Sequence, residues 1–555
     1  MDFDQRPIDL AQAAGNWLLI VIAFSLICLF IALAVSMLAA GLKGPGMVAE
    51  VLFRGLRDLA SMSLRRIGAM TQLVFRESLR KKTLWILAVF ILLFMFGHWF
   101  LASQAVESAA KRHVVFVMTA VKWLLVPVAV ILSCWGLPAD IKERSLHTVM
   151  TKPTRRSEVV LGRILGYSGV LLLMLLVMSV LGYVWILRAV PERARNQLIA
   201  RVPVYGELDF IDRVGKPAPI GINVGDIWEF RSFIEGMTAA RAVYKFDVSG
   251  FQGREPETLD IEYNFEAFRT HKGIMGENVR FSLHFVNPTK DLDVKFPRSS
   301  TPIFEFSADP EKRVLHVPRE FDTRNSDIRI TGERGAAGNV EPPKQLDLWK
   351  DLVSNNILQV QVSCDDSGQY LGMARPDMFF RLPDRSFFGA YVKTVLGYAL
   401  MLVLICTLGV TASTFVKGPV ATLLVGAYLM MGQLMRGLFD DQLTQFQDKG
   451  RPLGGGLLES IYRILTQDNQ MTELPVNAFT TSIQWIDNKI LQWLGAMHNI
   501  IPDFRLFDGT PYLANGFDIP WSVRSLSAIA ITLGFFIPCV VIGTYSLMVR
   551  ELEAK

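Results

Sequence analysis

Long runs of apolar residues alternate along the chain with stretches that have the composition of soluble protein. Runs of about 19 residues or more lie near 17–42, 84–102, 114–137, 159–190, 387–412, 419–438 and 524–548. A helix of that length rises about 1.5 Å per residue and crosses roughly 30 Å of hydrocarbon. The pattern therefore predicts a polytopic α-helical membrane protein with about seven transmembrane helices.

The stretch 191–386 has a different pattern, because apolar and polar residues alternate along it. Clear alternation covers 244–248, 259–265, 279–285 and 358–364, and shorter candidates lie at 302–307, 312–317 and 326–331. A period of two is typical of strands with one face in a core and the other in water. Many short strands of this kind predict an inserted all-β, sandwich-like domain.

Basic residues beside the apolar runs predict the orientation. Residues 43–82 hold nine Lys or Arg against three acids, and residues 138–163 hold six against three. Short loops rich in Lys and Arg stay in the cytoplasm. Alternation then places the N-terminus, the insert and the acidic stretch 439–522 outside, and the C-terminus inside. We expect a multi-pass protein of the bacterial cytoplasmic (inner) membrane.

These patterns divide the chain into successive parts. The parts are an N-terminal transmembrane anchor (1–42), a basic cytoplasmic segment (43–82), three spans joined by the loop 138–163 (83–190), the extracytoplasmic insert (191–386), two spans (387–438), an extracytoplasmic helical segment (439–522), and the last span with a cytoplasmic tail (523–555). The first run is too long for a signal peptide, and its N-terminal flank is acidic, so we expect it to be retained. Helical patterns within 439–522 could lie on the outer membrane surface or cap a transport path.

Composition and motifs indicate no enzyme chemistry. The net charge of +5 arises from basic residues beside the spans, which argues against nucleic-acid binding. Cys364 is the only cysteine in the insert, so the insert cannot contain an internal disulfide. The insert contains neither GxSxG nor HExxH, and its histidines have no metal-ligand spacing. The pairs Asp291/Asp293 and Asp365/Asp366 could bind a cation or could be solvated turn residues. We expect the insert to bind a substrate or an extracytoplasmic partner.

The cytoplasmic loop 138–163 predicts a short amphipathic helix. Asp140 can cap its N-terminus, and Pro153 ends it after about three turns. The apolar side is formed by Ile141, Leu146, Val149 and Met150, and the charged side includes Lys142, Glu143 and Arg144. Such a helix could dock into a groove on a soluble partner or lie in the membrane interface.

This loop resembles the first intracellular loop of ABC-2-type transporter permeases. The matching positions are Glu143, Pro153, Arg155, Arg156, Glu158, Gly162 and Arg163, whereas Arg144-Ser145 replaces the family's usual Gly-Thr. Thr71–Thr83 looks like the family's elbow helix, whose interfacial residues would be Phe75, Arg76, Arg80, Lys81 and Lys82. The segment from Ile501 to Glu551 is similar to the family's closing segment. The likeness covers about 71–190 and 387–555, so the first span and the insert are additions.

The resemblance implies a six-helix core and a function. In that family the loop forms the coupling helix that seats in a nucleotide-binding subunit. The resemblance therefore implies docking of a partner ATPase by Asp140, Ile141, Glu143, Arg144, Leu146, Val149, Met150, Pro153, Arg155, Arg156 and Glu158. No GxxxxGK[ST] motif is present, so ATP would bind to a separate ABC ATPase, and this chain would hold no cofactor and have no ATPase activity alone. Such permeases work in pairs, which implies a second copy or a paralogue. The alternative is a chain of the same architecture that transmits motion or anchors an envelope complex and moves no substrate.

Two features inside the membrane segments carry further expectations. Lys122 lies about eight residues into the third span, where we expect its ammonium group to snorkel outward along its stem. Gly162, Gly166 and Gly169 form a small-residue stripe that permits close helix packing, either between chains or within one chain.

Overall fold

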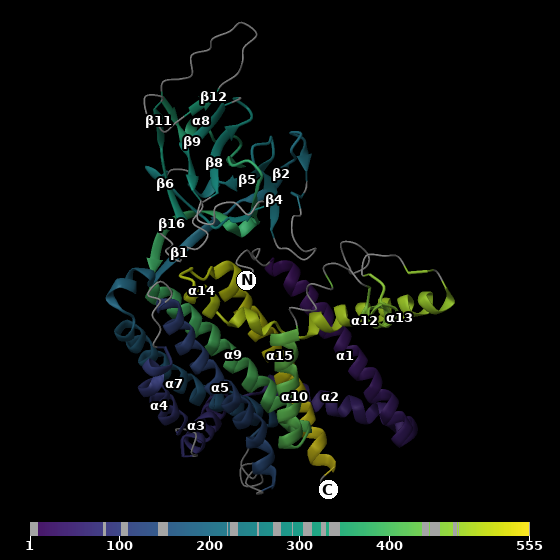
Figure 1. The fold of residues 1–555 in the computed structure, drawn as a ribbon. Coiled ribbons are helices and arrows are strands. Elements are labelled where there is room, and N and C mark those ends of the chain that lie inside the picture. Colours follow the sequence, from purple (N-terminus) through teal and green to yellow (C-terminus); the bar gives the residue numbers. More distant parts are fainter. Residues whose placement is uncertain are drawn as a thin grey trace.

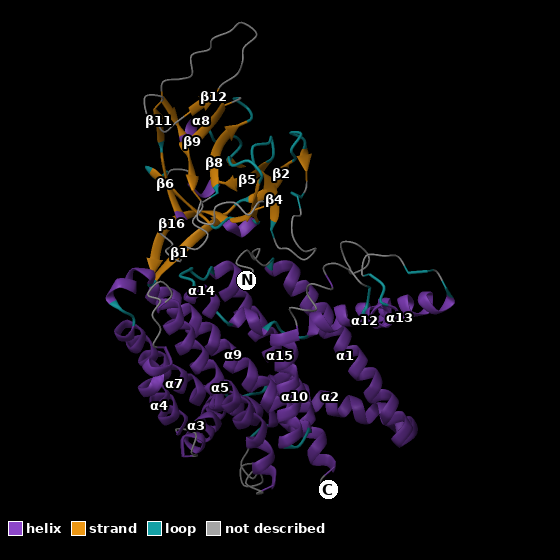
Figure 2. Ribbon diagram, in the orientation of Figure 1, coloured by secondary structure: helices purple, strands orange, loops and turns teal. Residues whose placement is uncertain are grey.

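The chain folds into a bundle of long helices with a β region at one end (Figures 1 and 2). The computed structural model describes residues 9–553 except for 81–84, 102–108, 143–153, 219, 223–230, 252–254, 270–278, 291, 303–312, 323–328, 332–344, 436–442, 444–454, 470–473 and 476. The first helix begins at the end of the bundle that carries the β region, and the C-terminus lies at the opposite end (Figure 1).

Five helical stretches among the described residues are long and apolar enough to cross a membrane. They are Leu10–Ala60, Ala109–Asp140, Arg156–Ala189, Phe387–Phe415 and Trp521–Val549. The first stretch contains α1 (Leu10–Ala40) and α2 (Gly44–Ala60), with a turn between them. The two remaining apolar runs also form helices, but shorter ones: α4 (Trp85–Leu101) and α10 (Gly418–Met430), which continues into a π-helical turn. The chain is therefore a multi-pass membrane protein.

Helix α9 (Phe387–Phe415) lies at the centre of the bundle. It packs against α5 (Ala109–Lys142), α7 (Arg156–Ala189) and α15 (Leu526–Glu553) around one apolar core. Ser386 caps its first turn by accepting a hydrogen bond from the backbone N–H of Gly389 at 3.3 Å. By contrast, no side chain of α1 is buried, as expected for a helix with lipid on most sides.

The β region is antiparallel in every described strand pair. Its strands are β1 (Ile199–Tyr205), β2 (Glu207–Ile211), β3 (Pro217–Ala218), β4 (Ser232–Glu235), β5 (Arg241–Asp247), β6 (Thr258–Tyr263), β7 (Glu266–Arg269), β8 (Arg280–Asn287), β9 (Leu292–Pro302), β10 (Val314–Pro318), β11 (Glu320–Asp322), β12 (Arg329–Thr331), β13 (Gln345–Asp347), β14 (Ile357–Cys364), β15 (Gln369–Met373) and β16 (Met378–Ser386). The main sheets have the orders β12-β9-β8-β14-β5-β2-β3 and β1-β16-β6-β10, with smaller sheets β4-β15-β7 and β11-β13.

A single apolar core joins the two main sheets. The ring of Phe246 on β5 stacks on that of Phe380 on β16, with centroids 3.7 Å apart, and Tyr263 meets Phe281 at 4.7 Å. The strictly alternating stretches of the sequence form β5, β6, β8 and β14, so their prediction as strands is confirmed. The candidates at 312–317 and 326–331 are confirmed in part as β10 and β12, and 302–307 lies largely outside the described residues.

Strands β1 and β16 connect the β region to the helices. They pair from Ile199 opposite Ser386 to Tyr205 opposite Phe379, and β16 leads directly into α9 (Figure 1). The insert is thus attached through two hydrogen-bonded strands rather than through two separate linkers, so a displacement of one strand is transmitted to the other.

Candidate functional site

Helix α3 (Leu64–Arg80), the elbow segment, lies against α7 along the glycine stripe. A Cβ on Gly162 would lie 2.5 Å from Cβ of Met70, and a Cβ on Gly166 would lie 2.7 Å from Cβ of Val74. Residues without side chains allow the two backbones to approach this closely. The stripe therefore serves helix packing within one chain, which is one of the two roles expected from the sequence.

The residues predicted for the elbow divide between two faces of α3. Phe75 packs against the bundle core and lies 3.3 Å from the position of a Cβ on Gly169, whereas Arg76 and Arg80 are exposed. Lys81 and Lys82 lie outside the described residues. The helix begins seven residues before the predicted Thr71, at Leu64, and it has the amphipathic character expected of an interfacial helix.

Replacing Gly166 with valine should destabilise the protein by about 1–3 kcal/mol, because the added methyl groups overlap Val74 and force α3 away from α7. The midpoint of thermal unfolding in detergent measures the change. Gly68→Ala on α3 is a matched control, since a Cβ there meets nothing within 4 Å and helix propensity favours alanine. Equal unfolding midpoints for the two variants would contradict the packing role of the stripe.

Glu158 joins the start of α7 to the turn between α2 and α3, residues 61–63, which we call the α2–α3 corner. Its side chain is fully buried, and one carboxylate oxygen accepts hydrogen bonds from the backbone N–H of Ser63 at 2.9 Å and from Nε of Arg66 at 3.0 Å. The other oxygen accepts from the backbone N–H of Arg155 at 3.0 Å and caps the start of α7. Glu158 thus makes internal contacts, whereas the resemblance predicts it among the docking residues. Its partners Ser63 and Arg66 are too distant along the sequence to be inferred from it.

Arg155 also binds this corner, through the last turn of α2 and Ser61. Its Nη1 donates to the carbonyl of Arg57 at 3.0 Å, hydrogen-bonds Ser61 Oγ, and lies 3.8 Å from a carboxylate oxygen of Asp58. The side chain of Arg155 is 30% exposed, so it also faces solvent at the base of the loop. Arg156 beside it is half-buried.

Asp140 differs from its predicted role. It lies in the last turn of α5, which runs through Pro138 to Lys142, so it does not begin a new helix. Its carboxylate pairs with the guanidinium of Arg163 on α7, and Arg163 also donates to the hydroxyl of Tyr167 at 3.2 Å. The two ends of the loop are thereby tied together. The side chain of Ile141 and the residues Glu143, Arg144, Leu146, Val149, Met150 and Pro153 lie outside the described part of the chain.

Lys122 does not snorkel outward. Its Nζ lies 2.8 Å from Oδ2 of Asp508, and both side chains are mostly buried. Tyr398 on α9 donates to Oδ1 of the same carboxylate at 3.1 Å and hydrogen-bonds Thr510 at 2.6 Å. Asp508 could not be predicted as the partner, because it is far from Lys122 along the chain. The only available signal was that an intramembrane charge usually has a partner.

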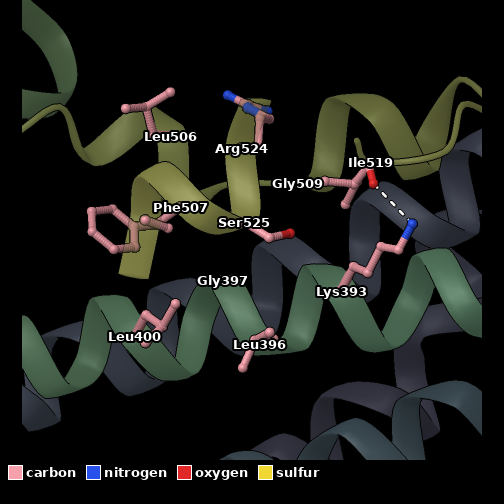
Figure 3. A pocket seen from close by; sticks show the side chains of 11 residues that line it. Lys393, Leu396, Gly397, Leu400, Leu506, Phe507, Gly509, Ile519, Arg524 and Ser525 are labelled. Atoms are coloured by element: carbon pink, nitrogen blue, oxygen red, sulfur yellow. Dashed lines mark hydrogen bonds between the residues drawn. The ribbon is translucent and has the colours of Figure 1, made fainter. Parts of the chain in front are cut away.

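A small cavity lies beside this network, between α9 and the segment 506–528 (Figure 3). Its volume of about 10 Å³ has room for about one water molecule. Lys393 points across it and donates to the carbonyl of Ile519 at 2.9 Å, and Arg524 closes another side by donating to the carbonyl of Asp508 at 3.1 Å. The cavity is too small for a substrate, so this region is a packed joint.

The strands that carry the insert are fastened to the same segment. The backbone of Arg201 on β1 exchanges hydrogen bonds with Gly516 and Asp518, both at 2.8 Å, and its guanidinium pairs with Glu262 and lies 4.3 Å from the ring centroid of Phe517. Burial raises the pKa of the Glu262 carboxyl, and the neighbouring Arg201 opposes that rise.

Asp518 completes this joint by pairing with Arg385 on β16 at 2.8 Å and with Lys393 on α9 at 2.7 Å. We call the ion pairs and hydrogen bonds of Arg201, Glu262, Arg385, Lys393 and Asp518 the outer clasp. The clasp joins the insert, α9 and the segment before α15, which lie in three separate parts of the sequence.

The outer face of the large sheet brings together Ser363, His284 and Asp293. Ser363 Oγ lies 3.4 Å from Nε2 of His284, whose Nδ1 lies 3.0 Å from Asp293. This order resembles a nucleophile, base and orienting acid, but Ser363 is 2% exposed and also donates to Asp365. A substrate could not reach a hydroxyl buried in this way, so the group is a cross-strand network.

The acid pairs considered for cation binding are engaged with protein donors where the structure describes them. Asp366 accepts from the backbone N–H of Arg280 at 2.6 Å, and Asp365 pairs with Lys295 at 3.3 Å. Asp291 lies outside the described residues. Within the described ranges, no group of three or more His, Cys, Asp or Glu side chains is placed to hold a metal ion.

Comparison of the chain with protein-family models, with curated proteins and with solved structures finds no match.

Proposed function

We propose that the chain is the transmembrane permease subunit of an ATP-driven ABC transporter and that it couples to a separate ATPase through the loop 143–153. The supporting observation is the way the loop is held at its base. Asp140 pairs with Arg163, while Glu158 and Arg155 bind the α2–α3 corner. A push on the loop would therefore move α5, α7 and α3 together, as rigid packed elements.

In this proposal α4 and α10 also cross the membrane, which gives about seven spans. The β region forms a sandwich-like extracytoplasmic domain, and the basic corner faces the cytoplasm. ATP would bind only to the partner subunit, and a second copy or a paralogue of this chain would complete the transporter. The docking contacts would come from Glu143, Arg144, Leu146, Val149 and Met150 in the loop, together with the exposed part of Arg155.

Purification of the tagged protein from its native membrane in mild detergent tests this proposal. We expect an ABC ATPase to co-purify in stoichiometric amount, because the loop would be its docking site. In the reconstituted complex, Glu143→Ala and Arg144→Ala should each lower the ATP hydrolysis that this chain stimulates in the ATPase by about tenfold. That factor is equivalent to about 1.4 kcal/mol of lost interaction. Membrane insertion of both variants should be unchanged.

Arg195→Ala is a matched control, because Arg195 lies beyond the other end of α7, in the 3-10 helix Glu192–Gln197, and its side chain is more than half exposed. Normal coupling in both loop variants would contradict the docking assignment. The absence of any ATPase under gentle conditions would contradict the permease function itself.

A second function, transmission of motion to an extracytoplasmic partner without transport, is favoured by one observation. The insert is attached by paired strands and by the outer clasp, and the cavity at that joint holds only about one water molecule. A closely packed connection of this kind is suited to transmitting motion from the helices to the insert. Under this second function, the Arg201→Ala variant should still hydrolyse ATP, but hydrolysis should no longer affect partner binding by the insert. If the chain is a transporter whose insert only captures substrate, the same variant should instead lose transport and keep the coupling between the permease and its ATPase.

A further inference from the structure

Helix α12 (Leu457–Thr466) has its charges inside and its large apolar side chains outside. Glu459 and Arg463 are 1% and 6% exposed and pair at 2.8 Å, while Leu457, Ile464 and Leu465 are 65%, 76% and 78% exposed. A helix in water places these residue types the opposite way round. The outward face of α12 is therefore suited to an apolar environment.

Helix α13 (Ala478–Ile500) makes a defined hairpin with α12. The carboxylate of Asp487 is buried and accepts hydrogen bonds from the backbone N–H groups of Leu458 at 3.0 Å and Glu459 at 2.8 Å, which caps the start of α12. Ile483 and Leu491, one turn to either side of Asp487, are also buried. Polar groups thus hold the hairpin together from within.

The outward surface of α13 is divided lengthwise. Phe479, Ile486, Ile490 and Trp493 recur at helical spacing and are exposed. Thr481, Asn488 and Gln492 lie exposed on another side of the helix. The polar side excludes a span through the hydrocarbon, and the apolar stripe is typical of a helix lying in a membrane interface.

The placement of the hairpin agrees with such an interface. It projects sideways from the bundle, across the direction of the long helices and near the end from which the β region rises (Figure 1). Among the described elements, the extensive packing of α12 and α13 is with each other. The hairpin therefore presents its apolar stripes away from the helices of the bundle.

We propose that the α12–α13 hairpin is embedded in the extracytoplasmic leaflet and that lipid acyl chains cover its apolar face. Tryptophan side chains favour this depth, since their apolar body and N–H group suit the boundary between acyl chains and headgroups. Trp493 lies in the stripe and is 63% exposed. The hairpin fixes the depth of the segment that leads to Asp508 and the outer clasp. This inference does not depend on whether the chain transports a substrate.

Spin labels on single cysteines test the inference in the full-length protein, reconstituted into vesicles of phosphatidylethanolamine and phosphatidylglycerol. Cys28→Ser removes the exposed native thiol, and the other four cysteines are buried. Ile461→Cys, Ile464→Cys and Trp493→Cys report on the apolar face. Asn488→Cys and Gln492→Cys are controls on the polar side of the same hairpin.

We expect collisions with molecular oxygen to exceed collisions with a water-soluble nickel chelate at the three apolar positions, and the reverse at the two controls. Nickel collisions that dominate at all five positions would place the hairpin in water and overturn the inference. Low collision rates with both reagents at the apolar positions would show a protein surface, such as a second copy of this chain, and would overturn it as well. Circular dichroism of each variant confirms that the helices are retained.

Discussion

Asp508→Asn should destabilise the protein by about 3–5 kcal/mol, because it leaves the ammonium group of Lys122 buried without a counter-charge. The carboxylate also accepts the hydroxyl hydrogen of Tyr398 and the backbone N–H of Thr510, at 3.0 Å. Asparagine has nearly the same shape and can keep one acceptor, so the loss reports mainly the charge. The unfolding midpoint of the detergent-solubilised protein should fall accordingly.

Two comparisons make this test specific. Asp209→Asn removes a carboxylate from a solvent-exposed pair with Lys245, and it should change stability by less than about 1 kcal/mol. Lys122→Met combined with Asp508→Asn should recover much of the loss, because no unpaired charge remains. If Asp508→Asn lowers the unfolding midpoint no more than Asp209→Asn does, the ion pair has no structural role in the joint.

The strands and long helices were predictable because each depends on a local pattern. Alternation of apolar and polar residues directed Phe281, Leu283 and Phe285 into the core, and the continuous register of β8 against β14 preserves that alternation. The length of apolar runs predicted α1, α5, α7, α9 and α15 for the same reason. Neither inference required knowledge of which elements are neighbours in space.

The ion pairs of the joints were not predictable, because they link distant parts of the chain. Nothing near Lys122 in the sequence indicates Asp508, and nothing near Glu158 indicates Ser63. No local pattern indicates that Pro138 lies inside a continuous helix, so the sequence predicts Asp140 at the start of a new one. Proline is tolerated within membrane helices, because neighbouring groups satisfy the backbone carbonyl that it leaves free.

The inverted polarity of α12 shows where local patterns fail. Its sequence is amphipathic, and amphipathicity alone does not say which face is inside. The partners that identify the inward face are Asp487 on α13, which accepts from the backbone N–H groups of Leu458 and Glu459, and Arg463, which pairs with the buried Glu459. A face can therefore be assigned to lipid or to a core only after the polar partners are located.

Glu158→Ala should have the second large effect, a loss of about 3–5 kcal/mol, because it removes a buried carboxylate from three donors at once. Arg66 would lose the counter-charge of Glu158, and the backbone N–H groups of Ser63 and Arg155 would lose this acceptor. Since these donors come from the α2–α3 corner and from the start of α7, the corner should separate from the bundle. We expect rapid proteolysis near Ser61 and a lowered unfolding midpoint.

Arg76→Ala is the matched control, because Arg76 is exposed on α3 and its replacement should change stability by less than about 0.5 kcal/mol. Arg66→Ala should fall between the two, since the Arg66 side chain is 36% exposed and water can replace part of the interaction. A double-mutant cycle of Glu158 and Arg66 then separates the ion pair from the backbone contacts. If the corner remains as resistant to protease in Glu158→Ala as in Arg76→Ala, Glu158 does not join the loop base to the elbow, and a push on the loop would have no direct path to α3.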